Sequence, residues 1–115
     1  MSLAVDWNTA LASVNGDRRL LKLVIDAFIT ESVQLRNQIS TAIVNEDAEL
    51  LHRSGHTFKG TMLTLGAEHW SHTAFRLEKL GSNGTTAGAQ SIADELTQHL
   101  PSLLEQLRTF SVELK

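Results

Sequence analysis

The sequence predicts an all-α fold, an antiparallel four-helix bundle with a short additional helix at its N-terminus. Apolar residues recur at three- and four-residue spacing along four long segments, which is the period of an amphipathic helix. The connections between these segments are short and rich in Asn, Asp and Gly, so consecutive helices should run antiparallel. The 115 residues are expected to form a single domain, residues 1–115, with one core that needs no disulfide.

Aspartates open the first two predicted helices. Asp6 caps a short helix that runs to about Val14, because its side chain accepts hydrogen bonds from the unpaired backbone N–H groups of the first turn. Asn15-Gly16 ends this helix, since both residue types tolerate the left-handed backbone found at helix C-caps. Asp17 then starts a long second helix. The apolar stripe of the second helix consists of Leu21, Val24, Ile25, Phe28, Ile29, Ile39 and Ile43.

Two further helices follow a tight turn. The turn is Asn45-Glu46-Asp47, and the third helix runs from it to about Leu65. Gly66 caps the C-terminal end of the third helix, so the chain reverses there. The fourth helix is expected over residues 67–80. Its buried residues are Trp70, Ala74 and Leu77.

A last helix closes the bundle. Residues 81–84, Gly-Ser-Asn-Gly, form the one clear loop before it. The apolar stripe of the last helix consists of Ile92, Leu96, Leu100, Leu103, Leu107, Phe110 and Leu114. Pro101 lacks a backbone donor and clashes with the carbonyl group of Thr97, so a kink or a break is expected there.

The third helix carries His56, Lys59 and Gly60 on one face. A helix turns by about 100° per residue, which divides its side chains between two faces. The outer face holds Glu49, His52, Arg53, His56, Lys59, Gly60 and Leu63, and the inner face holds Leu50, Leu51, Phe58, Met62 and Leu65. His56 is therefore predicted to point away from the core, where a phosphoryl group can reach it.

Two glycines, Gly55 and Gly60, lie inside the third helix, although each costs about 1 kcal/mol of helix stability relative to alanine. A role other than helix stability is therefore expected for them. Gly60 follows His56 by one turn. Because it has no Cβ atom, it leaves room for a phosphoryl group and for the backbone of a second protein.

The segment 56–66 reads HTFKGTMLTLG and resembles the signature of histidine-containing phosphotransfer (HPt) domains, roughly H-x-[hydrophobic]-K-G-x5-G. Further segments resemble the family pattern upstream and on the next helix: Asn15-Gly16-Asp17, Leu20-Leu21, Phe28, Asn45-Glu46-Asp47 and Leu77-Glu78. Leu65-Gly66-Ala67 is more similar to the phosphorelay type than to the P1 domain of chemotaxis histidine kinases. The resemblance covers nearly the whole chain.

This resemblance implies that His56 is phosphorylated on Nε2 in a multistep His-Asp phosphorelay, between the aspartates of two receiver domains. Lys59 is expected to offset charge on the phosphoryl oxygens and to favour the neutral, nucleophilic form of His56. Independently of the resemblance, His56 lies ten residues before the reversal at Gly66 and Glu78 twelve after it, so the two should lie at similar height on antiparallel neighbouring helices. Glu78 either orients the imidazole through the non-reacting ring nitrogen or is a solvated surface glutamate.

The expected partners are receiver domains of response regulators or of a hybrid sensor histidine kinase. Leu63, Phe75 and His52 lie near the His56 face and are candidate partner contacts. His52 is also the next candidate phosphoacceptor after His56. No cofactor is expected in this chain, and the Mg²⁺ used in transfer is expected in the receiver domain, because no carboxylate cluster here resembles an oxygen cage.

Composition excludes several other classes. The formal net charge of −3 with scattered Lys and Arg offers no basic stripe for nucleic acid. No apolar run approaches the ~20 residues of a membrane span, and the absence of cysteine makes the cytoplasm the default compartment. Without a nucleotide-binding motif, the chain is expected to be a monomeric phosphoryl carrier and not an autokinase. Residues 1–3, Met-Ser-Leu, are compatible with a cloning remnant.

Two alternative functions stay open. His52 and His56 are four residues apart and His69 and His72 are three apart, and these spacings can hold zinc, copper or haem iron in a helical bundle. Against metal binding, His52 and His56 face outward, and Lys59 places a like charge beside the ion. A passive helical adaptor would explain the bundle but neither the interior glycines nor Lys59.

Overall fold

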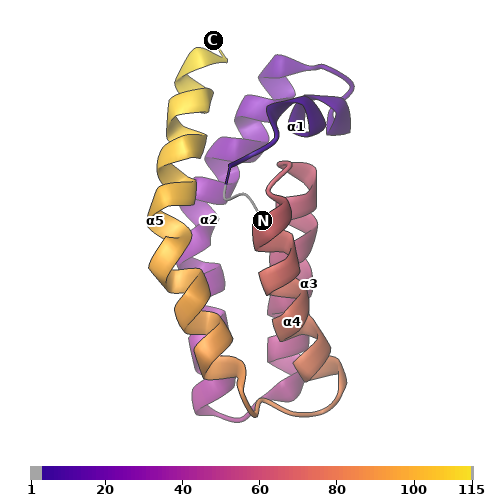
Figure 1. Ribbon diagram of the computed structural model, residues 1–115, viewed down its shortest axis with the longest axis vertical. Helices are drawn as coiled ribbons and strands as arrows, with labels where there is room; N and C mark the ends of the chain where they lie inside the picture. Colours follow the sequence, from indigo (N-terminus) through magenta and orange to yellow (C-terminus); the bar gives the residue numbers. More distant parts are fainter. Residues whose placement is uncertain (1–3, 115) are drawn as a thin grey trace.

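Helices make up most of residues 4–114, which are the residues that the computed structural model describes. The helices are α1 (Trp7–Ser13), α2 (Arg18–Val44), α3 (Ala48–Thr64), α4 (Glu68–Ser82) and α5 (Ala89–Glu113), and no strand occurs within residues 4–114. Helices α2 to α5 run side by side in alternating directions, and α1 lies across the end at which α2 begins (Figure 1). The predicted all-α bundle with a short N-terminal helix is confirmed. The expectation for residues 1–3 lies outside the described range.

Aspartate caps set the starts of the first three helices. Asp6 accepts hydrogen bonds from the backbone N–H groups of Asn8 and Thr9, at 3.1 and 3.2 Å. Asp17 and Asp47 each accept one from the N–H group three residues later, at 3.0 Å. These bonds satisfy backbone donors that have no partner inside the helix, which is why aspartate is preferred directly before a helix. The helix starts could therefore be predicted from the positions of these aspartates in the sequence.

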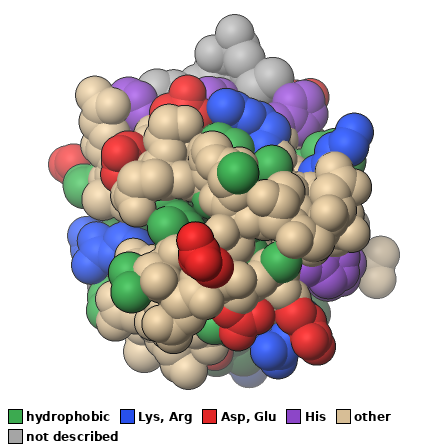
Figure 2. All heavy atoms as spheres, turned by 90° about the horizontal axis from the view of Figure 1, so that it is seen from below, with side chains coloured by type: hydrophobic (Ala, Val, Ile, Leu, Met, Phe, Trp, Pro, Cys, Tyr) green, Lys and Arg blue, Asp and Glu red, His purple; other side chains and the backbone are tan. Residues whose placement is uncertain are grey.

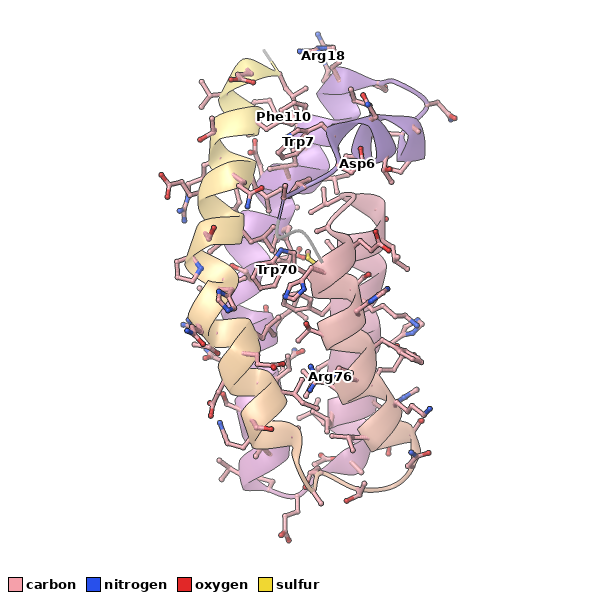
Figure 3. The ribbon with its side chains drawn as sticks, viewed as in Figure 1. Asp6, Trp7, Arg18, Trp70, Arg76 and Phe110 are labelled. Carbon is pink, nitrogen blue, oxygen red and sulfur yellow. The ribbon has the colours of Figure 1, made fainter. Side chains whose placement is uncertain are left out.

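Aromatic side chains join the helices around the core. Phe28 of α2 and Phe58 of α3 meet edge to face with ring centroids 5.6 Å apart. Trp70, which is 1% exposed, lies between α4 and α5 (Figure 3). Trp7 of α1 stacks on Phe110 of α5 with centroids 3.7 Å apart (Figure 3). The short helix α1 is thereby packed against the end of the bundle.

Charged side chains of both signs are interspersed on the end of the bundle that holds the α2–α3 and α4–α5 connections (Figure 2). This end therefore offers no strong field of one sign. No helix within residues 4–114 is long and apolar enough to cross a membrane.

Two glycines allow the backbones of α3 and α4 to approach closely. A Cβ atom built on Gly55 would lie 2.6 Å from the backbone nitrogen of Glu78 and 2.9 Å from its Cα atom. On Gly81 of α4, a Cβ atom would collide with the backbone of His52. A Cβ atom on Gly60 would meet no atom within 4 Å. Packing thus requires Gly55 and Gly81, whereas Gly60 faces open space.

The structure corrects the sequence interpretation at two places near α4 and α5. Gly81 and Ser82 belong to α4 and not to the loop, because the backbone of Gly81 continues to pack against α3. Of the kink or break expected at Pro101, the break does not occur, because α5 is helical without interruption from Ala89 to Glu113. Both Pro101 and Thr97 are exposed, so water can satisfy the carbonyl group of Thr97 that proline leaves without a donor.

Separate substitutions of the two α3 glycines test the close approach of α3 and α4. Gly55→Ala is expected to lower the free energy of unfolding by about 1–3 kcal/mol, the usual cost of overpacking. Gly60→Ala is expected to raise it by up to about 1 kcal/mol, because alanine favours a helix and meets no neighbour here. Urea unfolding followed by circular dichroism measures both changes. Equal changes in the two variants would contradict the assigned packing.

Candidate functional site

His56 stands on the outer face of α3, and 66% of its side chain is exposed. Its Nδ1 atom lies 3.2 Å from Oε1 of Glu78 on α4. Glu78 therefore lies at the height of His56, as expected from counting residues on either side of the reversal at Gly66. The imidazole is held on one edge by α4 and open to solvent elsewhere.

Glu78 is a buried carboxylate, since only 12% of its side chain is exposed. It is not a solvated surface glutamate. The ammonium group of Lys59 lies 2.8 Å from its Oε2 atom and donates a hydrogen bond to Oε1 at 3.2 Å. Burial by itself raises the pKa of Glu78, but hydrogen bonds from Lys59 and His56, together with their charges, outweigh burial and hold this pKa below the ordinary value of 4.5. Glu78 is therefore ionised at neutral pH.

The ionised Glu78 determines which nitrogen of His56 carries the proton. A carboxylate only accepts hydrogen bonds, so Nδ1 of His56 must be the donor in the 3.2 Å contact. In the neutral ring, the lone pair then resides on Nε2, which is directed away from Glu78. His56 thus presents a free nitrogen on its exposed side.

His52 makes a second contact with the same residue of α4. Its Nδ1 atom lies 3.3 Å from the backbone carbonyl oxygen of Glu78. The ring of His52 is nearly parallel to that of His56, at an interplanar angle of 24° with centroids 6.4 Å apart. The sequence could not reveal this contact, because its acceptor is a backbone atom on another helix.

A hollow of about 350 Å³ opens beside Lys59, between α3, α4 and the start of α1. Leu63 and Phe75 line this hollow and are 55% and 46% exposed. The ammonium group of Lys59 lies 5.3 Å from the centroid of the Phe75 ring. The structure thus gathers Lys59, Leu63 and Phe75 on one side of His56, while His52 lies on the other along α3.

The two histidines of α4 make other contacts, although His72 also lines the hollow beside Lys59. His72 lies 4.0 Å from Glu68 of its own helix, and His69 packs edge to face on Trp70 with ring centroids 5.3 Å apart. Burial and the nearby His99 lower the pKa of His69. In the part of the chain that the structure describes, no group of three or more His, Cys, Asp or Glu side chains is placed to hold a metal ion.

A helical bundle that presents an imidazole with one nitrogen fixed and the other free is the arrangement expected of a histidine phosphotransfer domain. A family model described as Hpt domain matches residues 23–110 of this chain. The chain therefore belongs to the Hpt family, and its role is histidine phosphotransfer in a phosphorelay, as a carrier that interacts with receiver domains. Comparisons with curated proteins and with solved structures gave no match.

The lowered pKa of Glu78 predicts how pH changes stability. A carboxylate with a depressed pKa in the folded state contributes stability above its unfolded pKa, and this contribution is lost as pH falls through the folded pKa. Glu78→Gln is therefore expected to be less stable than the wild type at pH 7, with a gap that shrinks as the pH falls below 4.5. Urea unfolding between pH 7 and pH 3 measures the gap. A gap that stays constant over this range would show that the carboxylate is not held ionised by its partners.

Proposed function

We propose that this chain accepts a phosphoryl group on Nε2 of His56 from the aspartyl phosphate of one receiver domain and passes it to the aspartate of another. The observation that carries the proposal is the contact between Nδ1 of His56 and Glu78, at 3.2 Å. It leaves the Nε2 lone pair free on a side chain that is 66% exposed. A receiver domain can therefore reach the nucleophile without any rearrangement of the bundle.

The proposed step is an in-line displacement at phosphorus. The Nε2 lone pair forms the new P–N bond while the P–O bond to the receiver aspartate breaks, and the aspartate leaves as a carboxylate. The imidazole ring gains positive charge as the P–N bond forms. Glu78, which accepts the Nδ1–H hydrogen bond, offsets this charge. Transfer to the second receiver is the reverse displacement.

Three residues of α3 support this step in the proposal. The ammonium group of Lys59 is held beside the ring because it shares Glu78 with His56, and in this place it offsets charge on the phosphoryl oxygens. Gly60 has open space where a Cβ atom would stand, so it provides clearance for the phosphoryl group and the receiver backbone. His52 lies one turn before His56 and contacts the docked receiver.

The hollow beside Lys59 is the proposed docking surface for the receiver. Leu63 and Phe75 supply exposed apolar area next to the reactive ring, which is the arrangement expected for a protein contact. The receiver is proposed to bring the Mg²⁺ that transfer requires, since hard cations prefer oxygen ligands. The chain acts as a monomeric carrier in the cytoplasm and has no autokinase activity of its own.

Substitution of the proposed nucleophile tests the function. His56→Gln is expected to abolish phosphoryl acceptance from a phosphorylated receiver, while the free energy of unfolding changes by no more than about 0.5 kcal/mol because the side chain is exposed. His99→Gln is the matched control, since His99 lies on α5 and does not line the hollow beside Lys59. Acid-labile, base-stable phosphate on the chain is the readout. Undiminished labelling of His56→Gln would refute the assignment.

A further inference from the structure

His52 and His56 form a matched pair of imidazoles on α3. They are one helical turn apart, and both are tied through Nδ1 to Glu78 of α4, His56 to the carboxylate and His52 to the carbonyl oxygen. Both acceptors can only accept hydrogen bonds, so both rings carry their proton on Nδ1. Two Nε2 lone pairs are therefore free on the same helix face.

This arrangement matches the outer shell of protein metal sites. A histidine that binds a metal through one nitrogen usually donates its other N–H group to a carboxylate or a backbone carbonyl, which fixes its tautomer and orientation. His56 has the carboxylate and His52 has the carbonyl, at 3.2 and 3.3 Å. Two histidines at i and i+4 on one helix face are also a known chelating pair.

The surroundings leave space for an ion. Both histidines line a hollow of about 340 Å³ between α2 and α3, on the side of the ring pair away from the Leu63–Phe75 hollow. The like charge of Lys59, which argues against a metal from sequence alone, is partly offset by the carboxylate of Glu78, which lies 2.8 Å from the ammonium group. Arg53 also lines the hollow, but it is exposed and its charge is screened by solvent.

We propose that His52 and His56 chelate a divalent transition-metal ion such as Zn²⁺ through their two Nε2 atoms, and that the bound ion blocks phosphoryl acceptance. Residues 4–114 offer no third protein ligand in place, so water completes the coordination shell. Metal–nitrogen bonds of about 2.0–2.1 Å require the two rings to tilt toward each other from their centroid separation of 6.4 Å. Imidazole favours Zn²⁺, Cu²⁺ and Ni²⁺ over Mg²⁺, so the Mg²⁺ of the receiver does not compete.

The blocking effect follows from a single lone pair. The Nε2 electrons of His56 can form a bond to the metal or to phosphorus, but not to both. Metal occupancy and phosphorylation are therefore mutually exclusive. This regulatory part rests on the proposed function, whereas metal binding itself does not depend on it.

Calorimetric titration with Zn²⁺ tests the binding site. The wild type is expected to bind one ion per chain, and Mg²⁺ is expected to give no heat of binding. Loss of even an outer-shell partner costs about 10- to 100-fold in metal affinity, so His52→Gln and His56→Gln should each weaken Zn²⁺ binding by at least about tenfold. His72→Gln is the matched control and should bind as the wild type does. Absence of binding, or binding that neither His52→Gln nor His56→Gln weakens, would overturn the proposed site.

Phosphoryl acceptance from one phosphorylated receiver tests the regulation. The rates of the wild type and of His52→Gln are measured with and without Zn²⁺, each relative to its own metal-free rate. Zinc sufficient to fill the site should slow the wild type by about tenfold or more, in proportion to occupancy, and His52→Gln much less. Equal inhibition of the two chains would place the effect on the receiver and overturn the regulation. A wild type that accepts no phosphoryl group without zinc would instead refute the proposed function, and the calorimetric result would stand.

Discussion

The close approach of α3 and α4 is the constraint on which the site depends. Gly55 and Gly81 remove the Cβ atoms that would otherwise separate the two backbones. Glu78 is thereby carried to the edge of α3, where its carboxylate is buried and where its backbone carbonyl reaches His52. A wider spacing between the helices would leave Glu78 in water and His56 without a fixed tautomer.

Burial of Glu78 then determines the electrostatics. A carboxylate taken out of water has to be compensated, and Lys59 and His56 both do so from α3. One interaction therefore links stability to the proposed chemistry. The carboxylate fixes the proton on Nδ1 and holds the ammonium group beside the ring, and in the proposed transfer it faces the positive charge that develops as Nε2 forms a bond. The site needs no deep pocket, because phosphoryl transfer depends on positioning and charge.

Much of the fold and of the site could be predicted from the sequence, because these features depend on local rules. Helix caps such as Asp17 and Asp47 act within one turn, and the outward position of His56 follows from helical periodicity. The height of Glu78 follows from counting along two antiparallel helices. The features that could not be predicted depend on distances between helices. They are the continuation of α4 past Gly81, the ion pair of Lys59 with Glu78, and the contact of His52 with the backbone carbonyl oxygen of Glu78.

The central claim is that Glu78 holds the neutral ring of His56 with its proton on Nδ1. Long-range proton–nitrogen correlation spectra of the ¹⁵N-labelled chain, recorded at a pH at which the ring is neutral, report directly which nitrogen carries the proton. We expect a protonated, pyrrole-type Nδ1 and an unprotonated, pyridine-type Nε2 in the wild type, and loss of this preference in Glu78→Gln. A wild-type ring with its proton on Nε2 would contradict the account, because the nitrogen assigned to receive the phosphoryl group would then have no free lone pair.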